Sequence, residues 1–188
     1  MWHVLFVMTN NEDKVVDFLR RQIQALNVDM PYKVFCPTRK LVHLCKGEKT
    51  EVSRVLFPGY IFMEMEETAY FRRMLRRSTK FFTILRDGEW SFETMRQDEI
   101  DAISILLNDL GEIEFSSGLV EDDRVRVLSG PLKNYCGKIL KINKRECKAK
   151  IQLTFRGYPT YTYVGLNAVE KFENDSFVDA RDFYFTKT

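Results

Sequence analysis

Long apolar runs are missing from the 188-residue sequence, and this excludes a membrane-spanning helix, which needs roughly 20 apolar residues. The first ten residues, MWHVLFVMTN, lack a basic segment and a small-residue cleavage site, so we expect no signal peptide, no membrane association and a cytoplasmic protein. Histidine is scarce, since His3 and His43 are the two in the chain. No constellation of nucleophile, histidine and carboxylate accompanies them, and neither a P-loop nor a dinucleotide fingerprint is present. We therefore expect neither an enzyme nor a cofactor.

Cysteine is also sparse, and its spacing argues against a zinc site. The four residues are Cys36, Cys45, Cys136 and Cys147, and no two of them form a C-x-x-C pair. In a chain without an export signal, this pattern indicates reduced thiols. His43 lies near Cys36 and Cys45 in the sequence, but structural zinc sites usually have a second close pair of ligands. We expect no bound metal.

The formal net charge of +2 conceals a strongly uneven distribution. Residues 1–108 are nearly neutral, and residues 109–122 contain five acids and no base. Residues 123–172 contain 11 lysines and arginines against three acids. A basic module of this kind points to a nucleic acid or another polyanion as its partner.

The first 108 residues alternate between apolar strands and amphipathic helices. Residues 2–9 predict a strand, Asn10 caps a helix, and Gly47 marks a turn between two extended arms over residues 38–54. Further strands are expected over 32–37, 56–65 and 81–88, with helices from residue 70 and from about residue 98. The order β-α-β-β-α-β is the split βαβ, or ferredoxin-like, arrangement of an α+β domain.

The pattern changes after residue 108. Residues 109–119 are rich in glycine, serine and acidic residues, which predicts a linker. Short strands with turn signals between them follow over residues 120–172, and they predict a small SH3-like β-barrel. Residues 173–188 form a polar C-terminal tail.

The stretch YFRRMLRRSTK, residues 70–80, concentrates positive charge on one face of its predicted helix. No acid lies between Glu67 and Asp87 to balance it. Arginines one turn apart can follow a phosphate backbone, so we expect contact with nucleic acid, the alternative being a solvated helix face. We call these residues the arginine run: Arg72, Arg73, Arg76, Arg77 and Lys80. Lys14, Arg20 and Arg21 of the first helix would extend it.

Two segments resemble one family in the correct order along the chain. The segment LFPGYIFMEM, residues 56–65, is similar to the FPGY strand of the NusG family of transcription elongation factors. The segment beginning DRVRVLSGPLKNYCGK, residues 123–138, resembles the family's C-terminal KOW domain. The resemblance implies an N-terminal NGN domain followed by a KOW domain. The basic KOW segment and the arginine run are more similar to the specialised antiterminator branch (LoaP-like, related in role to RfaH) than to the general factor.

The resemblance also implies partners. Phe6, Phe57 and Tyr60 would form an apolar patch that docks on the clamp helices of RNA polymerase. The arginine run would contact a nascent RNA hairpin or exposed non-template DNA. Through the KOW domain the chain would meet a small-subunit ribosomal protein, the termination factor Rho or RNA, using Phe155, Lys141, Lys144 and Arg145.

A monomeric, bacterial antitermination factor that suppresses pausing and termination in specific operons is the resulting hypothesis. Two alternatives stay open: a general NusG-type elongation factor and a ribosome-associated KOW protein that binds RNA. For the patch residues, a purely structural role in the sheet core is the competing interpretation, and for the KOW lysines it is a solvated barrel rim.

Overall fold

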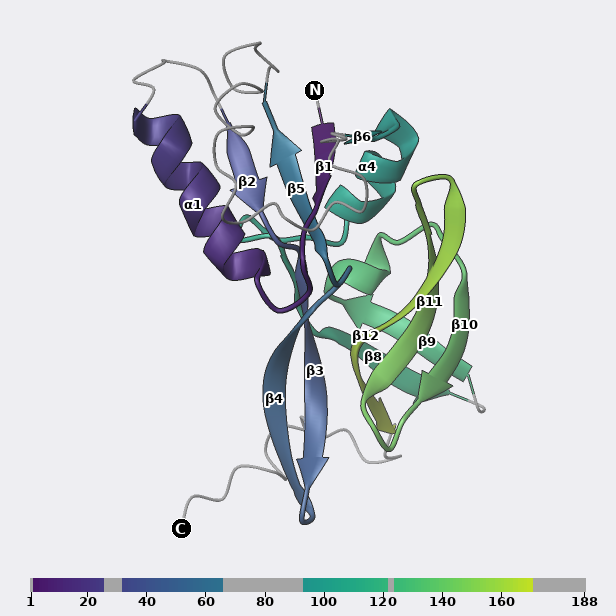
Figure 1. Cartoon of the computed structure of the whole chain (residues 1–188). Coiled ribbons are helices and arrows are strands. Elements are labelled where there is room, and N and C mark those ends of the chain that lie inside the picture. Colours follow the sequence, from purple (N-terminus) through teal and green to yellow (C-terminus); the bar gives the residue numbers. More distant parts are fainter. Residues whose placement is uncertain (1, 26–31, 66–92, 122–123, 171–188) are drawn as a thin grey trace. The chain divides into compact units, whose positions relative to one another are not determined.

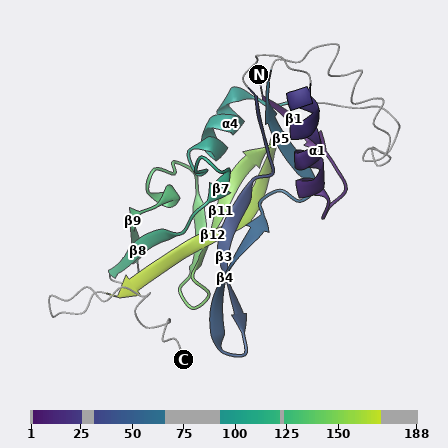
Figure 2. The same ribbon diagram turned by 90° about the vertical axis from the view of Figure 1, so that its left-hand side faces the viewer.

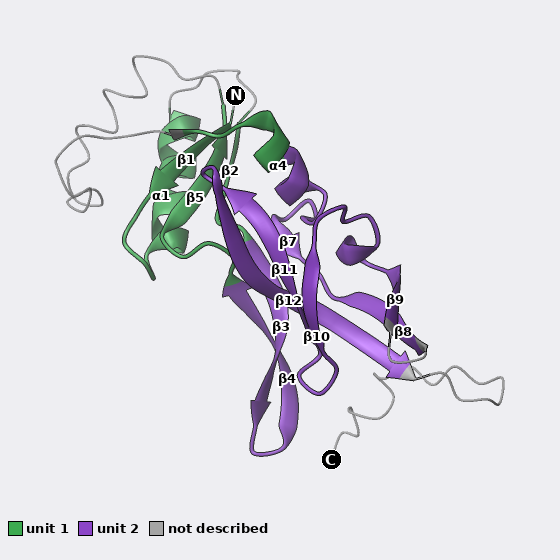
Figure 3. Cartoon of the chain, turned by 90° about the vertical axis from the view of Figure 1, so that its right-hand side faces the viewer, with its two compact units in different colours: residues 1–37, 55–100 green, residues 38–54, 101–188 purple. Residues whose placement is uncertain are grey.

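The computed structural model describes residues 2–25, 32–65, 93–121 and 124–170. The chain divides into two compact units, residues 1–37 with 55–100 and residues 38–54 with 101–188 (Figure 3). The arginine-rich helix expected at residues 70–80, the strand expected at 81–88 and the tail at 173–188 lie outside the described residues.

The first unit is built on an antiparallel sheet in the order β2-β5-β1-β6. Its strands are β1 (Trp2–Phe6), β2 (Lys33–Phe35), β5 (Tyr60–Glu64) and β6 (Glu93–Thr94). Helix α1 (Glu12–Ala25) lies along this sheet (Figure 1). Apolar residues of α1 recur at helical spacing, as the sequence predicts, and Val15, Leu19 and Ile23 are buried against Leu5, Ile61 and Met63 of the sheet.

Helix α1 begins one residue later than Asn10 would allow as its cap. Asn10 itself has a positive φ of 71°, which asparagine tolerates better than most residues. The carbonyl of Asn11 accepts the first helical hydrogen bond from Val15 N at 3.0 Å, so Asn11 occupies the N-cap position. The expected cap at Asn10 is therefore corrected to Asn11.

The second unit contains a long hairpin of β3 (Thr38–Cys45) and β4 (Glu48–Val55). Lys46 and Gly47 between them both have positive φ, 50° and 88°, which is the signature of a type I′ turn. This confirms the two extended arms and the turn at Gly47. The short strand β7 (Glu112–Ile113) pairs in parallel with β3, giving a sheet of order β4-β3-β7.

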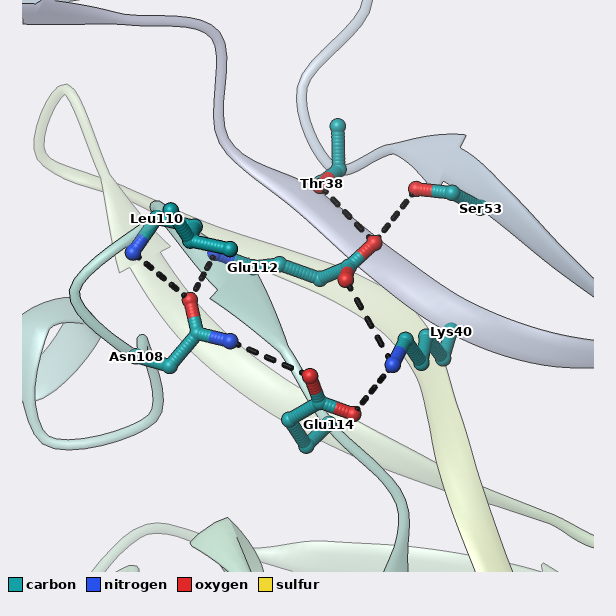
Figure 4. Close-up of polar contacts among 7 residues, drawn as sticks. All are labelled: Thr38, Lys40, Ser53, Asn108, Leu110, Glu112 and Glu114. Atoms are coloured by element: carbon teal, nitrogen blue, oxygen red, sulfur yellow. Dashed lines mark hydrogen bonds and ion pairs between the residues drawn. The ribbon is translucent and has the colours of Figure 1, made fainter.

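Residues 109–119, expected to be a linker, carry two strands instead, β7 and the start of β8 (Ser116–Glu121). Two acids of this segment, Glu112 and Glu114, contact side chains of the hairpin, as Figure 4 shows. Glu112 Oε1 accepts hydrogen bonds from Ser53 Oγ at 2.6 Å and Thr38 Oγ1 at 3.3 Å. Lys40 Nζ lies 2.6 Å from Glu114 Oε2 and 3.7 Å from Glu112 Oε2. The Lys40–Glu114 hydrogen bond raises the pKa of Lys40.

The remaining strands form a five-stranded sheet in the order β10-β11-β12-β8-β9, with β12 as its longest strand (Figure 2). The elements are β9 (Arg124–Ser129), the 3-10 turn η1 (Pro131–Lys133), β10 (Ile139–Asn143), β11 (Lys148–Phe155) and β12 (Tyr158–Glu170). The sequence predicts only short strands here, whereas β12 is one continuous strand of 13 residues. Gly165 of β12 lets β3 approach, since a Cβ there would lie 2.9 Å from Lys40 O.

The α+β class is confirmed: strands and helices in the N-terminal part precede a β-rich C-terminal part. Helix α4 (Gln97–Ser104) begins close to residue 98, as the sequence predicts. By contacts, the hairpin and residues 101–108 group with the C-terminal strands, so the compact units do not follow the expected boundary at residue 108. Among the described helices, none has both the length and the apolar composition needed to cross a membrane.

Candidate functional site

The FPGY segment forms a tight turn at the entrance to β5. Tyr60 N donates to Phe57 O at 3.1 Å, which closes a four-residue β-turn. Pro58 precedes Gly59, whose φ is +83°, and this combination is typical of a type II turn. A Cβ on Gly59 would lie 3.1 Å from Val7 O and 3.2 Å from Phe6 Cε2. Glycine is therefore required both by the backbone conformation and by the close approach of β1.

Phe6 and Tyr60 lie side by side at the ends of their strands. They are directly paired in the register of β1 and β5, and their ring centroids are 5.3 Å apart. Phe6 is 41% exposed and Tyr60 is half-buried. Because side chains alternate along a strand, both rings lie on the sheet face opposite Leu5 and Ile61, which pack toward α1. The structure thus brings together two of the three residues of the expected apolar patch.

Phe57, the third expected patch residue, is in the interior and not on the surface. It is 4% exposed, and its ring centroid lies 5.8 Å from that of Phe62, which is also buried. The Phe57 side chain anchors the turn to the core, because an apolar ring is more stable against Phe62 than in water. Its contribution to the patch is support rather than contact.

A buried carboxylate from helix α1 holds the turn in place. Glu12, in the first turn of α1, accepts a hydrogen bond at Oε1 from Gly59 N at 2.8 Å, and Val7 N donates to Gly59 O at 2.8 Å. Both peptide groups of Gly59 are thereby satisfied. Glu12 was not singled out from the sequence, because its partner lies 47 residues away and no local pattern marks the contact.

The three cations expected on α1 do not form one face. Lys14 and Arg21 are exposed and seven residues apart, about two helical turns, so they share a face. Arg20 lies about 100° further round the helix. Its guanidinium donates to Val34 O from Nε at 3.1 Å and from a terminal nitrogen at 2.8 Å. Arg20 therefore ties α1 to β2 and has an evident structural role. The residues of the arginine run, Arg72, Arg73, Arg76, Arg77 and Lys80, lie outside the described residues.

The expected KOW surface is partly exposed and partly buried. Lys141 on β10 is exposed, and Lys144 and Arg145 are exposed in the loop between β10 and β11. Phe155, expected to face a partner, is 7% exposed and lies on the inner side of β11 with Ile151 and Leu153. The expectation of a surface aromatic at this position is corrected, because strand alternation places it with the core residues.

Two residues on the outer side of the same sheet were missed by the sequence analysis. Tyr161 and Tyr163 of β12 are exposed and lie close to Lys150 and Lys148 of β11. A signal for them was available in the sequence. A Lys-x-Lys motif precedes the Arg156-Gly157 turn and a Tyr-x-Tyr motif follows it, so alternation places all four side chains on one face. Among the described residues, no group of three or more histidine, cysteine or acidic side chains is arranged to hold a metal ion.

Comparison with known proteins yields a consistent set of similarities. Residues 1–104 match the family model described as "Transcription termination factor nusG". The protein named "Transcription termination/antitermination protein NusG" from Thermus thermophilus is 30% identical over 179 residues, covering 90% of this chain and 97% of that protein. The protein of the same name from Escherichia coli K12 is 24% identical over 172 residues, covering 90% and 95%. The solved structure described as "Domain interaction in Thermotoga maritima NusG" superimposes with a TM-score of 0.47 at 18% identity, covering 87% of this chain and 92% of that one.

Proposed function

This chain belongs to the NusG family, and from that premise we propose that it is a processive antitermination factor that acts in specific operons. The names of its relatives, which combine termination and antitermination, support a role on transcribing RNA polymerase. The factor has no bond-making step to perform. Its effect comes from binding, and the two surfaces that matter are an aromatic patch and a set of cationic side chains.

The observation that carries the proposal is the Phe6–Tyr60 pair. Two adjacent rings with a centroid separation of 5.3 Å, one of them 41% exposed, form an apolar anchor on a rigid turn. Aromatic anchors of this kind dominate the free energy of many protein interfaces. The backbone of the turn that carries Tyr60 is held by the hydrogen bond from Gly59 N to Glu12, so little backbone freedom is lost when a partner binds. The proposed partner is the pair of clamp helices of RNA polymerase, and the bound factor would bridge the clamp and disfavour pausing.

Recruitment to particular operons is assigned to the arginine run. Arg72, Arg73, Arg76 and Arg77 would contact a nascent RNA hairpin or exposed non-template DNA, with Lys80 close by. The support is the sequence itself: four arginines lie within six residues, with no acid among them. Lys14 and Arg21, which share an exposed face of α1, extend this set. Arg20 is left out because its guanidinium is bonded to β2.

A KOW-domain partner, a small-subunit ribosomal protein or Rho, would meet the loop that carries Lys144 and Arg145. Both side chains are exposed there, and Glu146 N donates to Asn143 Oδ1 at 3.0 Å, which shapes the loop. Phe155 is buried at the other end of β11, beside the turn to β12, so we assign it to the core and not to this contact.

Polymerase binding is tested with the full chain and core RNA polymerase in a pull-down or a titration. Phe6→Ala and Tyr60→Ala should each weaken binding by more than tenfold, as expected for anchor residues. Leu110→Ala is the matched control, because Leu110 is an exposed apolar residue outside the patch. Equal binding by all three variants would remove the patch from the polymerase interface.

Operon specificity is tested by single-round transcription through an intrinsic terminator. One template carries the leader of the neighbouring operon, and the other carries a scrambled leader. Readthrough with the native leader alone supports the specialised factor, and the fourfold alanine variant of Arg72, Arg73, Arg76 and Arg77 should abolish it. The control removes the same charge from dispersed exposed positions: Lys33, Lys46, Arg54 and Arg96. Equal effects on both templates would indicate a general elongation factor instead.

A further inference from the structure

The outer face of the β10–β11–β12 sheet carries alternating lysines and tyrosines. In the antiparallel register, Lys150 is paired with Tyr163 on one side and with Lys141 on the other. Lys148 and Tyr161 lie on the same face two residues along their strands. Tyr161 is 53% exposed and Tyr163 is 36% exposed. We call these five residues, Lys141, Lys148, Lys150, Tyr161 and Tyr163, the lysine–tyrosine face.

A tight turn fixes the alignment of this face. Phe155 is paired with Tyr158, so only Arg156 and Gly157 lie between β11 and β12, with φ values of 55° and 77°. A two-residue turn with positive φ at both positions sets the register of a hairpin and leaves no room for slippage. Buried residues alternate with the face along β11, as Ala149, Ile151 and Leu153 show. The lysines and tyrosines are therefore held outward by the core on the other side.

The cations already lie over the rings. Lys148 Nζ is 4.6 Å from the ring centroid of Tyr163, and Lys150 Nζ is 5.3 Å from that of Tyr161. These cation–π contacts keep the rings extended on the surface and place positive charge beside each one. A base stacked on an aromatic ring is a stronger interaction than an exposed cation–π contact. A base can thus replace the ammonium group over the ring, and the flexible lysine can turn to the neighbouring phosphate.

We propose that the lysine–tyrosine face binds a short segment of single-stranded RNA. Bases stack on Tyr161 and Tyr163, and phosphates pair with Lys141, Lys148 and Lys150. Tyr161 and Tyr163 are two residues apart, so their Cα atoms are separated by about 6.7 Å along the strand, twice the spacing of about 3.4 Å between stacked bases in a duplex. Bases that reach both rings must be unstacked from each other, which is the state of a single strand and not of a helix.

The charge around the face favours a polyanion. From residue 124 to residue 150 the sequence contains nine bases and one acid, Glu146. The Glu146 carboxylate forms an ion pair with Lys148, and this hydrogen bond lowers the pKa of Glu146. Glu146 competes with phosphate for one of the three lysines. Its neutralisation should therefore strengthen RNA binding.

The choice of RNA rests on the proposed function, since an elongation factor on RNA polymerase lies beside the emerging transcript. The lysine–tyrosine face nevertheless shares no residue with the arginine run or with the Phe6–Tyr60 pair. Its loss should leave the affinity for core polymerase unchanged, so failure of this inference and failure of the proposed function give different results.

The test uses the full chain and a fluorescein-labelled RNA of about 10 nucleotides without self-complementarity, which suits a single small β-domain. Binding is followed by fluorescence anisotropy in the background of the fourfold alanine variant of the arginine run. Tyr161→Ala and Tyr163→Ala should each weaken binding by about 5- to 150-fold, the range for loss of one stacked base. The phenylalanine variants at both positions should stay close to wild type, because stacking is retained. Tyr158→Ala is the matched control. Tyr158 is an exposed tyrosine beside the turn, and strand alternation places it outside the lysine–tyrosine face.

The lysines are tested by the salt dependence of the same titration. Replacing Lys141, Lys148 and Lys150 by glutamine should reduce the slope of log affinity against log salt by about 2, since each phosphate contact on a single strand contributes about 0.7. Glu146→Gln should increase affinity. The inference is overturned if the parent protein does not bind the RNA, or if both tyrosine-to-alanine variants bind as the parent does. Equal affinity for DNA of the same sequence would overturn the assignment to RNA.

Discussion

The backbone N–H of Gly59 donates a hydrogen bond to the Glu12 carboxylate at 2.8 Å, across 47 residues of sequence. One end of this contact is the FPGY turn and the other is the first turn of helix α1. The turn carries Tyr60 and lies against Phe6, so the aromatic patch depends on where α1 begins. A single buried carboxylate thus connects the helix to the proposed polymerase-binding surface.

Removal of this carboxylate should destabilise the protein. Glu12→Ala leaves the buried Gly59 N–H without its acceptor, and we expect a loss of about 1–3 kcal/mol in the free energy of unfolding. Glu12→Gln keeps an acceptor oxygen and should lose less. Asp13→Ala is the control, since Asp13 lies in the same helical turn, is exposed and should cost only about 0.3–1 kcal/mol through the helix dipole. Urea unfolding of the three variants distinguishes these outcomes, and similar losses for Glu12→Ala and Asp13→Ala would contradict the role given to the hydrogen bond.

Substitution of two glycines of similar conformation should distinguish the cost of backbone strain from the cost of steric contact. Gly59 and Gly47 have φ values of +83° and +88°, but only Gly59 has neighbours within reach of an added Cβ. Gly47→Ala should cost about 1–2 kcal/mol from the left-handed conformation alone. Gly59→Ala should cost about 1–3 kcal/mol more, because Val7 O and the Phe6 ring must move away. Thermal unfolding measures the difference. A smaller loss of stability for Gly59→Ala than for Gly47→Ala would show that β1 moves away from the added Cβ at no cost.

Local signals in the sequence were sufficient for the elements that depend on local physics. The hairpin over residues 38–54 follows from Gly47 in a polar turn, and the turn before β5 follows from Pro58-Gly59. The strands of the C-terminal sheet follow from alternation, which burial along β11 reproduces residue by residue. In each case the pattern and the structure share one cause, the period of two in a strand or the need of a turn for positive φ.

Contacts between distant segments were beyond the reach of such patterns. Residues 109–119 have the composition of a linker, yet Glu112 and Glu114 are held by Lys40, Ser53 and Thr38 of the hairpin. The sequence pattern predicts that these acids are solvated, because their partners lie some 60 or 70 residues away in the sequence. Phe57 and Phe155 were assigned to surfaces by resemblance, whereas packing against Phe62 and strand parity place both inside.

The attachment of the hairpin to residues 108–114 should depend more on Glu112 than on Lys40. Glu112→Ala removes the acceptor for two hydroxyl groups at once, and we expect a loss of about 1–3 kcal/mol. Lys40→Ala removes a partly exposed ion pair and should cost at most about 1 kcal/mol. Hydrogen exchange of the amides of residues 38–54 reports both losses. Added salt should reduce the contribution of Lys40 and leave that of the hydroxyl groups, and an equal response to salt would contradict this division.

The thiols should differ sharply in reactivity. Burial, with the negative charges of Glu12 and Asp13, raises the pKa of the Cys36 thiol from 9.0 to about 12. Cys45 and Cys136 are exposed. Because the thiolate is the reactive form, a pKa three units higher reduces its population near pH 8 by about a thousandfold. Iodoacetamide should label Cys45 and Cys136 first, and Cys36 only after unfolding, with peptide mass spectrometry as the readout.

The same shift makes stability depend on pH in one direction. Below about pH 9, Cys36 is protonated in both the folded and the unfolded chain, so it contributes no pH dependence. As the pH rises from 9 toward 12, the unfolded chain loses the Cys36 proton while the folded chain retains it. The free energy of unfolding therefore falls with pH in this window. Between pH 8 and pH 10, the urea midpoint should fall less in Cys36→Ala than in the parent protein. Cys45→Ala is the control and should fall as the parent does. If the midpoint of Cys36→Ala falls as much as that of the parent, the titrating group is not Cys36.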